Sequence, residues 1–373
     1  MISRFILAVG LAILMVVTGT SSYVYLARHQ SKLAVAPEKP TAATPRANAF
    51  TLPGTLYFAQ GGAIYSLEAG RFHQLTPEQG WTQPSLFPNG TALLAVKQNA
   101  QYSDVYVLNT FGTVMRRITN NTTTSRFQSI SDYHWSFYPR LSFDGGTVWM
   151  SYDQPKFGYD VVLSVWAMPV GGTIRQGKLW TNAADYTGGD AQPVPAPGGG
   201  IVYTKYSYGL DGTLSGQLWF TNRAYSAGRA LTTPAEDCRD PAFSPSGTQV
   251  AMVCTYGKQL SELTIAPWSA STLGRRQTVI SDQMVAQPVW APDGSGLAYF
   301  APGFADGPFQ LWWLPSAAYT APPPVPTPPA TPGGPHNGPL PSPSAGPPPP
   351  STARIEVTTN LGFDATSPMS WGA

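Results

Sequence analysis

Chemistry in this chain would depend on carboxylates and aromatic rings, because other reactive side chains are scarce. The 373 residues include four histidines and two cysteines. The sequence has no Gly-x-Ser-x-Gly elbow, His-Glu-x-x-His helix, Walker loop or Gly-x-Gly-x-x-Gly turn. We therefore predict no catalytic residues and no cofactor. A Ca²⁺ ion held by clustered carboxylates is the one metal to consider, although no EF-hand spacing supports it.

Nine residues make up the candidate ligand site. They are acids, aromatic residues and one histidine from segments that we predict below to be loops on one face of the fold. Carboxylates next to exposed rings suit a cationic, sugar or peptide ligand. The alternative is that Asp and Tyr stand there only because they are favourable loop residues. The candidate residues are Trp81, Asp132, His134, Trp135, Asp185, Asp190, Asp237, Asp240 and Tyr208.

These loops are placed by a phrase that recurs six times: a polar residue, a proline, a strand-like triplet and a turn that usually ends in glycine. The proline of the phrase advances by 55, 54, 48, 47 and 80 residues. A period near 50 residues indicates an array of one repeated supersecondary unit. The six prolines are Pro84, Pro139, Pro193, Pro241, Pro288 and Pro368.

Each full period contains four strand-like runs, which predicts four-stranded antiparallel units. After Pro368 only a first strand follows, whereas residues 55–76 supply three strands before the first phrase. These two ends together complete a sixth unit. We therefore predict an all-β, six-bladed β-propeller closed by its N- and C-terminal strands in one blade. The predicted outermost strands are 71–76, 114–119, 177–181, 229–232, 277–280 and 354–358.

The phrase resembles the TolB-like propeller repeat, whose signature is Pro-x-Trp-Ser-Pro-Asp-Gly followed by an apolar strand. Residues 241–247 (Pro-Ala-Phe-Ser-Pro-Ser-Gly) and 288–294 (Pro-Val-Trp-Ala-Pro-Asp-Gly) match it best. The resemblance extends over residues 53–373 and implies the fold. For function it implies a binding scaffold or an accessory domain of a serine peptidase.

Loops of antiparallel blades alternate between the two faces of a propeller. We call the face with the inter-blade loops and the second-to-third-strand loops the loop face, and the face with the remaining tight turns the turn face. The nine candidate residues fall on the loop face. Most basic residues fall near the turn face, where the chain also enters the ring, because Thr55 opens a second strand. We therefore expect the turn face to look toward an anionic membrane.

Three segments lie outside the predicted ring. Residues 1–28 are predicted to be an uncleaved transmembrane signal-anchor, with a cleaved signal peptide as the alternative. Residues 29–53, rich in Ala, Pro and Thr, are predicted to be a stalk. Residues 319–352, dominated by proline, are predicted to be a disordered insert between the third and fourth strands of the fifth blade. The propeller, residues 54–373, is then extracytoplasmic, either periplasmic or at the cell surface.

The two cysteines are predicted to form a disulfide. Cys238 and Cys254 lie at equal distances from Ser246, the centre of a predicted hairpin. They should therefore face each other across antiparallel strands, where the Cβ atoms are close enough to be bridged. An exported chain also meets oxidising conditions. Two separate buried thiols are the alternative.

Composition narrows the function further. Charged residues make up 11% of the chain and the formal net charge is +2, so nucleic acid is not an expected partner. The sequence predicts a monomeric, membrane-anchored, non-catalytic propeller that binds a protein, peptide or other ligand outside the cytoplasm. The alternatives are a metal-dependent propeller enzyme of lactonase or cyclase type and an accessory propeller for a separate peptidase.

Overall fold

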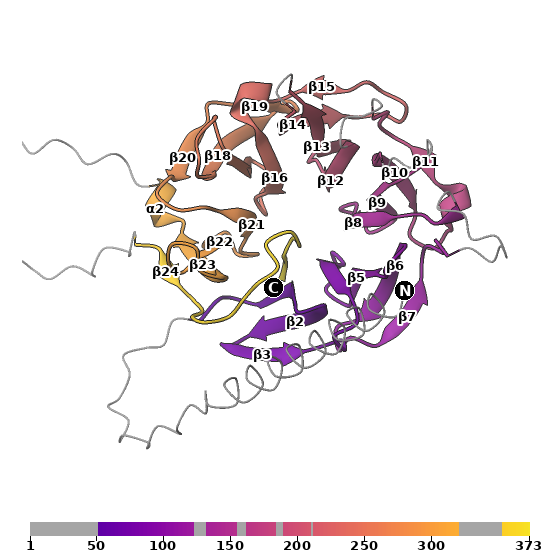
Figure 1. Ribbon diagram of the computed structural model, residues 1–373, viewed down its shortest axis with the longest axis horizontal. Helices are drawn as coiled ribbons and strands as arrows, with labels where there is room; N and C mark the ends of the chain where they lie inside the picture. The colour runs from indigo at the N-terminus through magenta and orange to yellow at the C-terminus, as the bar shows by residue number, and fades with distance from the viewer. Residues whose placement is uncertain (1–50, 123–131, 155–161, 184–188, 210–211, 321–352) are drawn as a thin grey trace, which may run out of the picture. The chain divides into compact units, whose positions relative to one another are not determined.

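The six predicted units are present as six antiparallel sheets arranged around one centre (Figure 1). The computed structural model describes residues 51–122, 132–154, 162–183, 189–209, 212–320 and 353–373. The predicted signal-anchor, most of the stalk, Asp185 and nearly all of the proline-rich insert lie outside the described residues. Within the described ranges, no helix is long and apolar enough to cross a membrane.

Each sheet is one blade, and its strands follow one another outward from the centre. Blade one consists of β4 (Trp81–Leu86), β5 (Ala92–Gln98), β6 (Ser103–Asn109) and β7 (Val114–Arg117). Blade two consists of β8 (Ser136–Leu141), β9 (Thr147–Tyr152), β10 (Ser164–Pro169) and β11 (Lys178–Leu179). Blade three consists of β12 (Gly189–Pro195), β13 (Ile201–Tyr208), β14 (Leu214–Thr221) and β15 (Arg229–Ala230). Blade four consists of β16 (Cys238–Phe243), β17 (Gln249–Cys254), β18 (Glu262–Ser269), β19 (Thr272–Leu273) and β20 (Gln277–Ile280). Blade five consists of β21 (Ala286–Trp290), β22 (Gly296–Pro302), β23 (Phe309–Pro315) and β24 (Ile355–Glu356). Blade six consists of β25 (Ser370–Gly372), β1 (Thr55–Gln60), β2 (Ala63–Glu68) and β3 (Arg71–Gln74).

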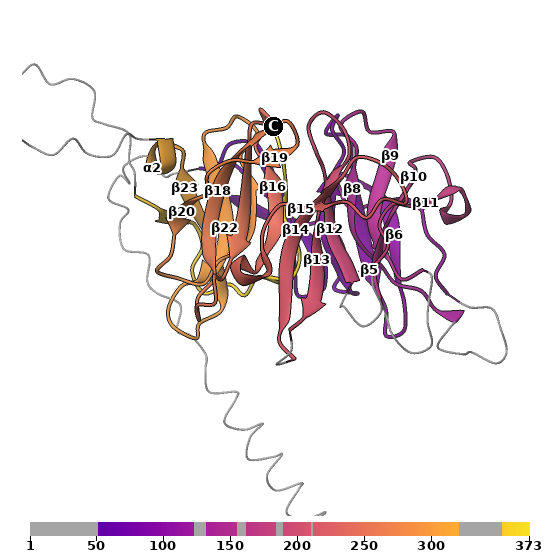
Figure 2. The same cartoon turned by 90° about the horizontal axis from the view of Figure 1, so that it is seen from above.

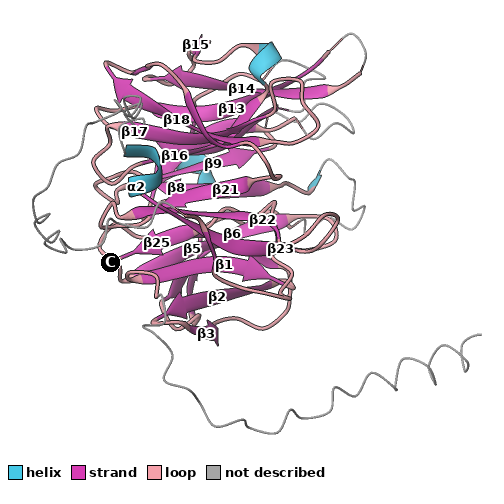
Figure 3. Ribbon diagram, turned by 90° about the vertical axis from the view of Figure 1, so that its left-hand side faces the viewer, coloured by secondary structure: helices cyan, strands magenta, loops and turns pink. Residues whose placement is uncertain are grey.

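Strands dominate the described part of the chain, as Figure 3 shows. Helix there comprises α2 (Ala317–Thr320) and two short 3-10 turns, η2 (Ile174–Gln176) and η3 (Pro234–Glu236), and Asp132 also has 3-10 conformation. Blade four has a fifth strand, because both β19 and β20 pair with β18. The sequence did not predict the β18–β19 hairpin or the short helices. The all-β, six-bladed architecture is confirmed.

The two ends of the ring meet in the sixth blade. β25 pairs with β1 in antiparallel register, with Leu56 opposite Trp371 and Thr55 opposite Gly372. The Trp371 indole N–H donates a hydrogen bond to the Pro53 carbonyl at 2.6 Å. The predicted closure by the terminal strands is therefore confirmed. The chain enters the ring and ends on the same side, the turn face, where the C-terminal end is marked in Figure 2.

The core lies between neighbouring blades, and the second strands form most of it. In β5, Leu93, Leu94, Ala95 and Val96 have no exposed surface. Leu94 and Val96 pack in a cluster with Met150 of the second blade, whereas Leu93 and Ala95 pack in a cluster with the sixth blade. A strand that is covered on both sides is expected to be apolar at every position. The continuous apolar run after each turn therefore joins one blade to its two neighbours.

Five of the six outer strands are shorter than the sequence predicts, and a threonine explains the difference. β7 ends at Arg117 because Thr119 Oγ1 accepts a hydrogen bond from the Val105 backbone N–H at 2.9 Å. The side chain thus replaces the carbonyl that the next ladder pair would have supplied. The same contact occurs in five blades, at Thr76, Thr119, Thr181, Thr232 and Thr358.

Replacing Thr119 with valine tests this arrangement. Valine keeps the shape of the side chain but removes the acceptor for Val105 N–H and the donor to Asp104 Oδ1, which lies 2.9 Å from the hydroxyl. Because these partners are buried, we expect the free energy of unfolding in urea to fall by about 1–3 kcal/mol. Thr113→Val, at an exposed position, is the control and should change it by less than about 0.5 kcal/mol. Equal losses from both substitutions would contradict the role of the Thr119 hydroxyl.

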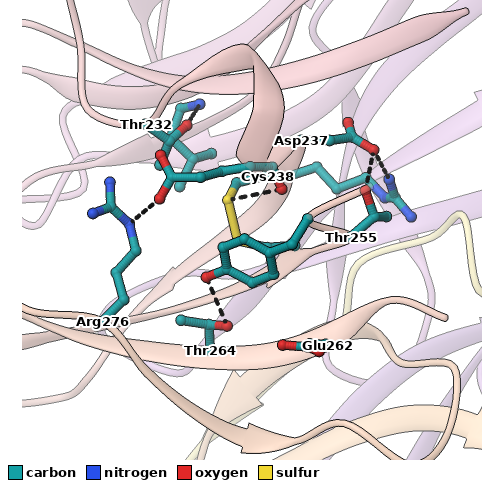
Figure 4. Close-up of a disulfide and its surroundings, with 12 residues drawn as sticks. Thr232, Asp237, Cys238, Thr255, Glu262, Thr264 and Arg276 are labelled. Carbon is teal, nitrogen blue, oxygen red and sulfur yellow. Dashed lines mark hydrogen bonds and ion pairs between the residues drawn. A yellow bond between two sulfur atoms is a disulfide. The ribbon is translucent and has the colours of Figure 1, made fainter. Parts of the chain in front are cut away.

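The predicted disulfide between Cys238 and Cys254 is present (Figure 4). The two residues are direct partners across β16 and β17, with Cα atoms 4.1 Å apart. Both side chains are fully buried. Next to the bridge, Thr255 Oγ1 donates a hydrogen bond to Asp237 at 2.7 Å. The disulfide therefore ties the innermost strand of blade four to its second strand, beside the loop that enters the blade.

The proline-rich insert has its predicted place in the topology, between β23 and β24 of the fifth blade. Its first residues belong to the ring, however. Tyr319, in α2, is buried and packs edge-on against Trp290, with ring centroids 5.8 Å apart. The insert therefore begins after α2 rather than at residue 319.

Candidate functional site

The residue before each repeat proline marks the centre of the ring. In five blades this residue has φ between 49° and 54°, a left-handed conformation that non-glycine residues rarely adopt. Each lies in a β-bulge, where two residues of the inner strand face one residue of the second strand. Proline suits such a bulge because it has no N–H to pair. The five residues are Gln83, Tyr138, Gln192, Asp240 and Gln287.

These five residues and Ser367, their equivalent in the sixth blade, form what we call the axial ring. At four of the six interfaces between its members, a side-chain oxygen of one residue accepts a hydrogen bond from the backbone N–H of the next. The pairs are Gln83 N to Ser367 Oγ (2.8 Å), Tyr138 N to Gln83 Oε1 (2.6 Å), Asp240 N to Gln192 Oε1 (3.2 Å) and Gln287 N to Asp240 Oδ2 (3.3 Å). The repeat phrase thus provides hydrogen bonds from blade to blade around the axis.

A cavity of about 460 Å³ extends from the axial ring to the turn face. Its floor includes Tyr138, Gln192, Asp240 and Gln287, and its mouth lies at the inner-strand turns, where Phe143 is 63% exposed. The volume is in the range of small-molecule sites, roughly 300–1,000 Å³. The wall between floor and mouth is formed by the residues two positions after the axial ring, namely Ser85, Arg140, Val194, Ala242, Val289 and Met369.

Asp240 is the acid of the cavity floor. Its carboxylate accepts hydrogen bonds from the side-chain amides of Gln192 and Gln287. Burial raises the pKa of Asp240 above the ordinary value of 3.8, although the charge of Arg239 acts in the opposite direction. Burial also raises the pKa of Tyr138, to about 12. The floor can therefore donate and accept hydrogen bonds while it carries at most one negative charge.

The raised pKa of Asp240 predicts a specific pH dependence. Between 3.8 and the higher pKa of the folded state, the folded chain binds the proton more tightly than the unfolded chain, so stability falls as the pH rises through this interval. An asparagine side chain at this position cannot ionise. We therefore expect the free energy of unfolding of Asp240→Asn, relative to the wild type, to increase from about pH 4 to neutral pH in urea titrations.

Asp293→Asn is the control for this measurement, because hydrogen bonds from Ser295 lower the pKa of Asp293 and the sign of the dependence is reversed. The stability of that variant, relative to the wild type, should fall as the pH rises toward 3.8 and stay nearly constant from about pH 5 to neutral pH. A difference between Asp240→Asn and the wild type that does not vary with pH would contradict the prediction.

The predicted site residues do not form one group. Of the eight that the structure describes, Asp240 alone lines the cavity. Trp81 is only 3% exposed and packs against Tyr106, with ring centroids 5.3 Å apart. Asp190 is fully buried and pairs with Lys205 Nζ at 2.7 Å, and burial raises its pKa. Trp81 and Asp190 therefore both have structural contacts within their blades.

Three further candidates hold the loops next to the ring in place. Asp237 accepts a hydrogen bond from the Gly216 backbone N–H at 2.6 Å. His134 Nδ1 lies 2.8 Å from Asp153 Oδ1. Trp135 stacks on Phe137, with ring centroids 5.7 Å apart. These residues have structural partners, and a binding role for them stays a prediction.

Tyr208 and Asp132 are the exposed candidates of the loop face. Tyr208, at the end of β13, is 56% exposed. Within the described residues, no group of three or more His, Cys, Asp or Glu side chains is arranged to hold a metal ion. A Ca²⁺ site on the loop face therefore stays a prediction.

The turn face carries less unpaired positive charge than the sequence suggests. Arg354 forms two hydrogen bonds with the Asp282 carboxylate, at 2.5 and 2.8 Å, and Arg276 pairs with Glu236 at 2.8 Å. Asp293 also lies in a turn on this face. An orientation of the turn face toward a membrane stays a prediction.

The cavity differs from the site that the sequence predicts, because inner strands and their turns line it and the predicted site lies in loops. A signal was nevertheless present in the repeat. When the six phrases are aligned on their prolines, the residue after the proline is small or apolar in five cases and arginine in one, Arg140. A charge at a position that is otherwise small or apolar in every blade indicates a role beyond the fold.

A solved structure supports the fold. The chain is similar to TolB from Acinetobacter baumannii, with a TM-score of 0.53 and 15% identity, over 70% of this chain and 61% of that one. The chain is also similar to a gluconolactonase from Xanthomonas campestris, with a TM-score of 0.46 and 11% identity, over 73% of this chain and 86% of that one. A third similar structure is a puromycin-hydrolyzing peptidase from Mycobacterium tuberculosis, with a TM-score of 0.45 and 12% identity, over 70% of this chain and 45% of that one.

No family model and no curated protein matches the sequence. The chain has the six-bladed β-propeller fold, and this fold is similar to that of TolB from Acinetobacter baumannii. It spans less than two thirds of the length of the Acinetobacter TolB.

Proposed function

We propose that this chain is a non-catalytic binding propeller whose ligand or protein partner enters the central cavity from the turn face. The observation that carries the proposal is the cavity itself, which has a hydrogen-bonded polar floor and mostly apolar walls. Binding sites are commonly preformed, concave and apolar, with a few placed polar groups. Because the axial ring links neighbouring blades, the floor needs no rearrangement before a ligand binds.

The proposed location is outside the cytoplasm. The disulfide supports it, because disulfides persist mainly in oxidising compartments. Anchoring by residues 1–28 and a monomeric state belong to the same proposal. The turn face would then carry both the point where the chain enters the ring and the mouth of the cavity.

Site-specific photo-crosslinking distinguishes the turn face from the loop face. A photoreactive phenylalanine analogue replaces Phe143 at the cavity mouth in one variant and Tyr208 on the loop face in another, in the full chain within its source cells. The two positions have similar exposure, 63% and 56%. We expect a discrete, reproducible adduct at position 143. An adduct only at position 208 would instead favour the loop face, and no adduct at either position would contradict a binding function for these surfaces.

The sequence also left two alternatives open, a metal-dependent enzyme and an accessory propeller. Metal analysis of the purified full chain tests the first, because stoichiometric Ca²⁺ or Zn²⁺ would favour it. Identification of a peptidase in the adduct at position 143 would favour the second. A small ligand bound in the cavity would give neither stoichiometric metal nor a crosslinked peptidase.

A further inference from the structure

Arg140 stands alone in the wall of the cavity. At the equivalent position the other five blades have serine, valine, alanine, valine and methionine, and all six side chains line the cavity. Arg140 is the one basic residue and Asp240 the one acidic residue of this described lining. The wall is therefore a surface of small and apolar side chains with a single charged group, the guanidinium of Arg140.

The guanidinium of Arg140 has no carboxylate partner in the described part of the chain. None of the ion pairs found there includes it. Its hydrogen bond is a long one, from Nη1 to the Pro84 carbonyl at 3.4 Å. Burial lowers the pKa of Arg140 to about 10, so the group remains charged at neutral pH. Enclosed charges are usually paired, and a guanidinium has five N–H donors.

Asp240 does not supply the missing partner. Its two carboxylate oxygens accept hydrogen bonds from Gln192 and Gln287 within the axial ring. No ion pair joins it to Arg140, although both line the same cavity. The described lining therefore leaves the charge of Arg140 to be compensated by a molecule that enters from the mouth.

We propose that the central cavity binds a molecule with one carboxylate and an apolar body, with the carboxylate on Arg140 and the body against the apolar wall. The inference rests on the proposed binding function and names its ligand class. Planar, paired N–H groups of arginine match a carboxylate in a bidentate geometry. A second negative charge on the ligand would meet no second cation in the lining, and it would lie in the same cavity as Asp240. Monoanions are therefore favoured over phosphates and dicarboxylates.

The apolar side of the recognition comes from the wall and the mouth. Val194, Val289 and Met369 contribute aliphatic surface around the axis, and Phe143 adds an exposed ring at the entrance. Each methylene that leaves water for such a surface contributes about 0.8 kcal/mol. Affinity should therefore rise with the chain length of a linear carboxylate until the cavity is full.

Octanoate is a suitable probe, and tryptophan fluorescence of the full chain is a suitable readout, because Trp290 and Trp371 both line the cavity. We expect saturable binding of octanoate that is stronger than that of butyrate, and no comparable binding of octan-1-ol or inorganic phosphate. Arg140→Gln should weaken octanoate binding at least tenfold, since it removes charge-assisted hydrogen bonds. Arg175→Gln, an exposed arginine of η2 near the turn face, is the matched control and should bind as the wild type does.

The thermal stability of unliganded Arg140→Gln tests whether weaker octanoate binding by this variant results from misfolding. Since the charge is partly buried and has no carboxylate partner in the described residues, the midpoint of thermal unfolding should stay the same or rise. A second pair of probes, one apolar hexapeptide with a free C-terminal carboxylate and the same peptide amidated, distinguishes a chain end from a small acid. Stronger binding of the free peptide than of octanoate, abolished by amidation, would assign the carboxylate to a chain end.

Equal octanoate binding by the wild type and Arg140→Gln, or equal binding of octanoate and octan-1-ol, would overturn the inference. Absence of any carboxylate binding would overturn it as well. If an adduct still formed at position 143 in that case, the cavity mouth would remain a binding site and only the ligand class would be wrong.

Discussion

A chain that ends at Ala365 is expected to lose its cooperative unfolding transition. The deletion removes β25, leaves β1 as an unpaired inner edge and deprives the core of Met369 and Trp371. It also orphans two backbone donors, because Gln83 N–H and Leu86 N–H donate to Ser367 Oγ and Ser370 Oγ at 2.8 and 2.9 Å.

The loss is large compared with the stability of a folded domain. Removal of a large buried side chain costs about 2–5 kcal/mol, and each buried donor left unpaired costs about 1–3 kcal/mol. Their sum approaches the total of about 5–15 kcal/mol that stabilises a typical domain. Without the eight C-terminal residues, the first and fifth blades would also lose the strand between them.

Circular dichroism during heating and size-exclusion chromatography measure this effect. The truncated chain should aggregate or unfold without a sharp midpoint, whereas a chain that lacks only Ala373, which is exposed and outside β25, should behave as the wild type does. A sharp midpoint within about 5 °C of the wild-type value in the truncated chain would show that the ring does not depend on its terminal closure.

Loss of the disulfide is expected to lower stability by about 3 kcal/mol. Cys238 and Cys254 are 16 residues apart, and a cross-link of that span removes roughly this amount of loop-closure entropy from the unfolded chain. For a domain of this size the midpoint of thermal unfolding should fall by roughly 5–10 °C in the Cys238→Ala/Cys254→Ala double variant.

Reduction of the wild type separates the cross-link from the packing of the side chains. A reductant should lower the wild-type midpoint toward that of the double variant and leave the variant unchanged. A wild type that keeps its midpoint after thiol titration has shown both cysteines to be reduced would contradict the prediction. Both sulfurs are buried in the same cluster, so the variant also reports any small cavity left by the two side chains.

The blades were predictable because their determinants are local and repeated. A proline after a polar residue, a glycine turn and an apolar run recur at a near-constant period, and each has its own conformational reason. The disulfide was predictable for a similar reason, since an antiparallel hairpin fixes which residues face each other. The ends of the outer strands were not predictable from the sequence. A threonine side chain such as that of Thr119 replaces a backbone acceptor there without changing the strand-like sequence pattern.

The residues of the candidate site were harder to predict from the sequence than the fold. Trp81 and Asp190 resemble exposed loop residues in the sequence, yet one packs against Tyr106 and the other pairs with Lys205. The sequence predicts Asp240 to be a loop acid, whereas the structure places it in an inner-strand bulge at the floor of a cavity. Exposure and partners depend on residues that are distant in the chain, and a repeat pattern does not specify them.

The sequence by itself determined the number of blades, the order of their strands, the closure by the two ends and the cysteine pair, because each follows from spacing along the chain. The tertiary structure decided which side chains meet at the axis. Six equivalent positions, spread over 285 residues from Gln83 to Ser367, come together only when the ring closes. Only then does Arg140 become the one basic residue in the described lining of the cavity, because its neighbours in the wall come from five other blades.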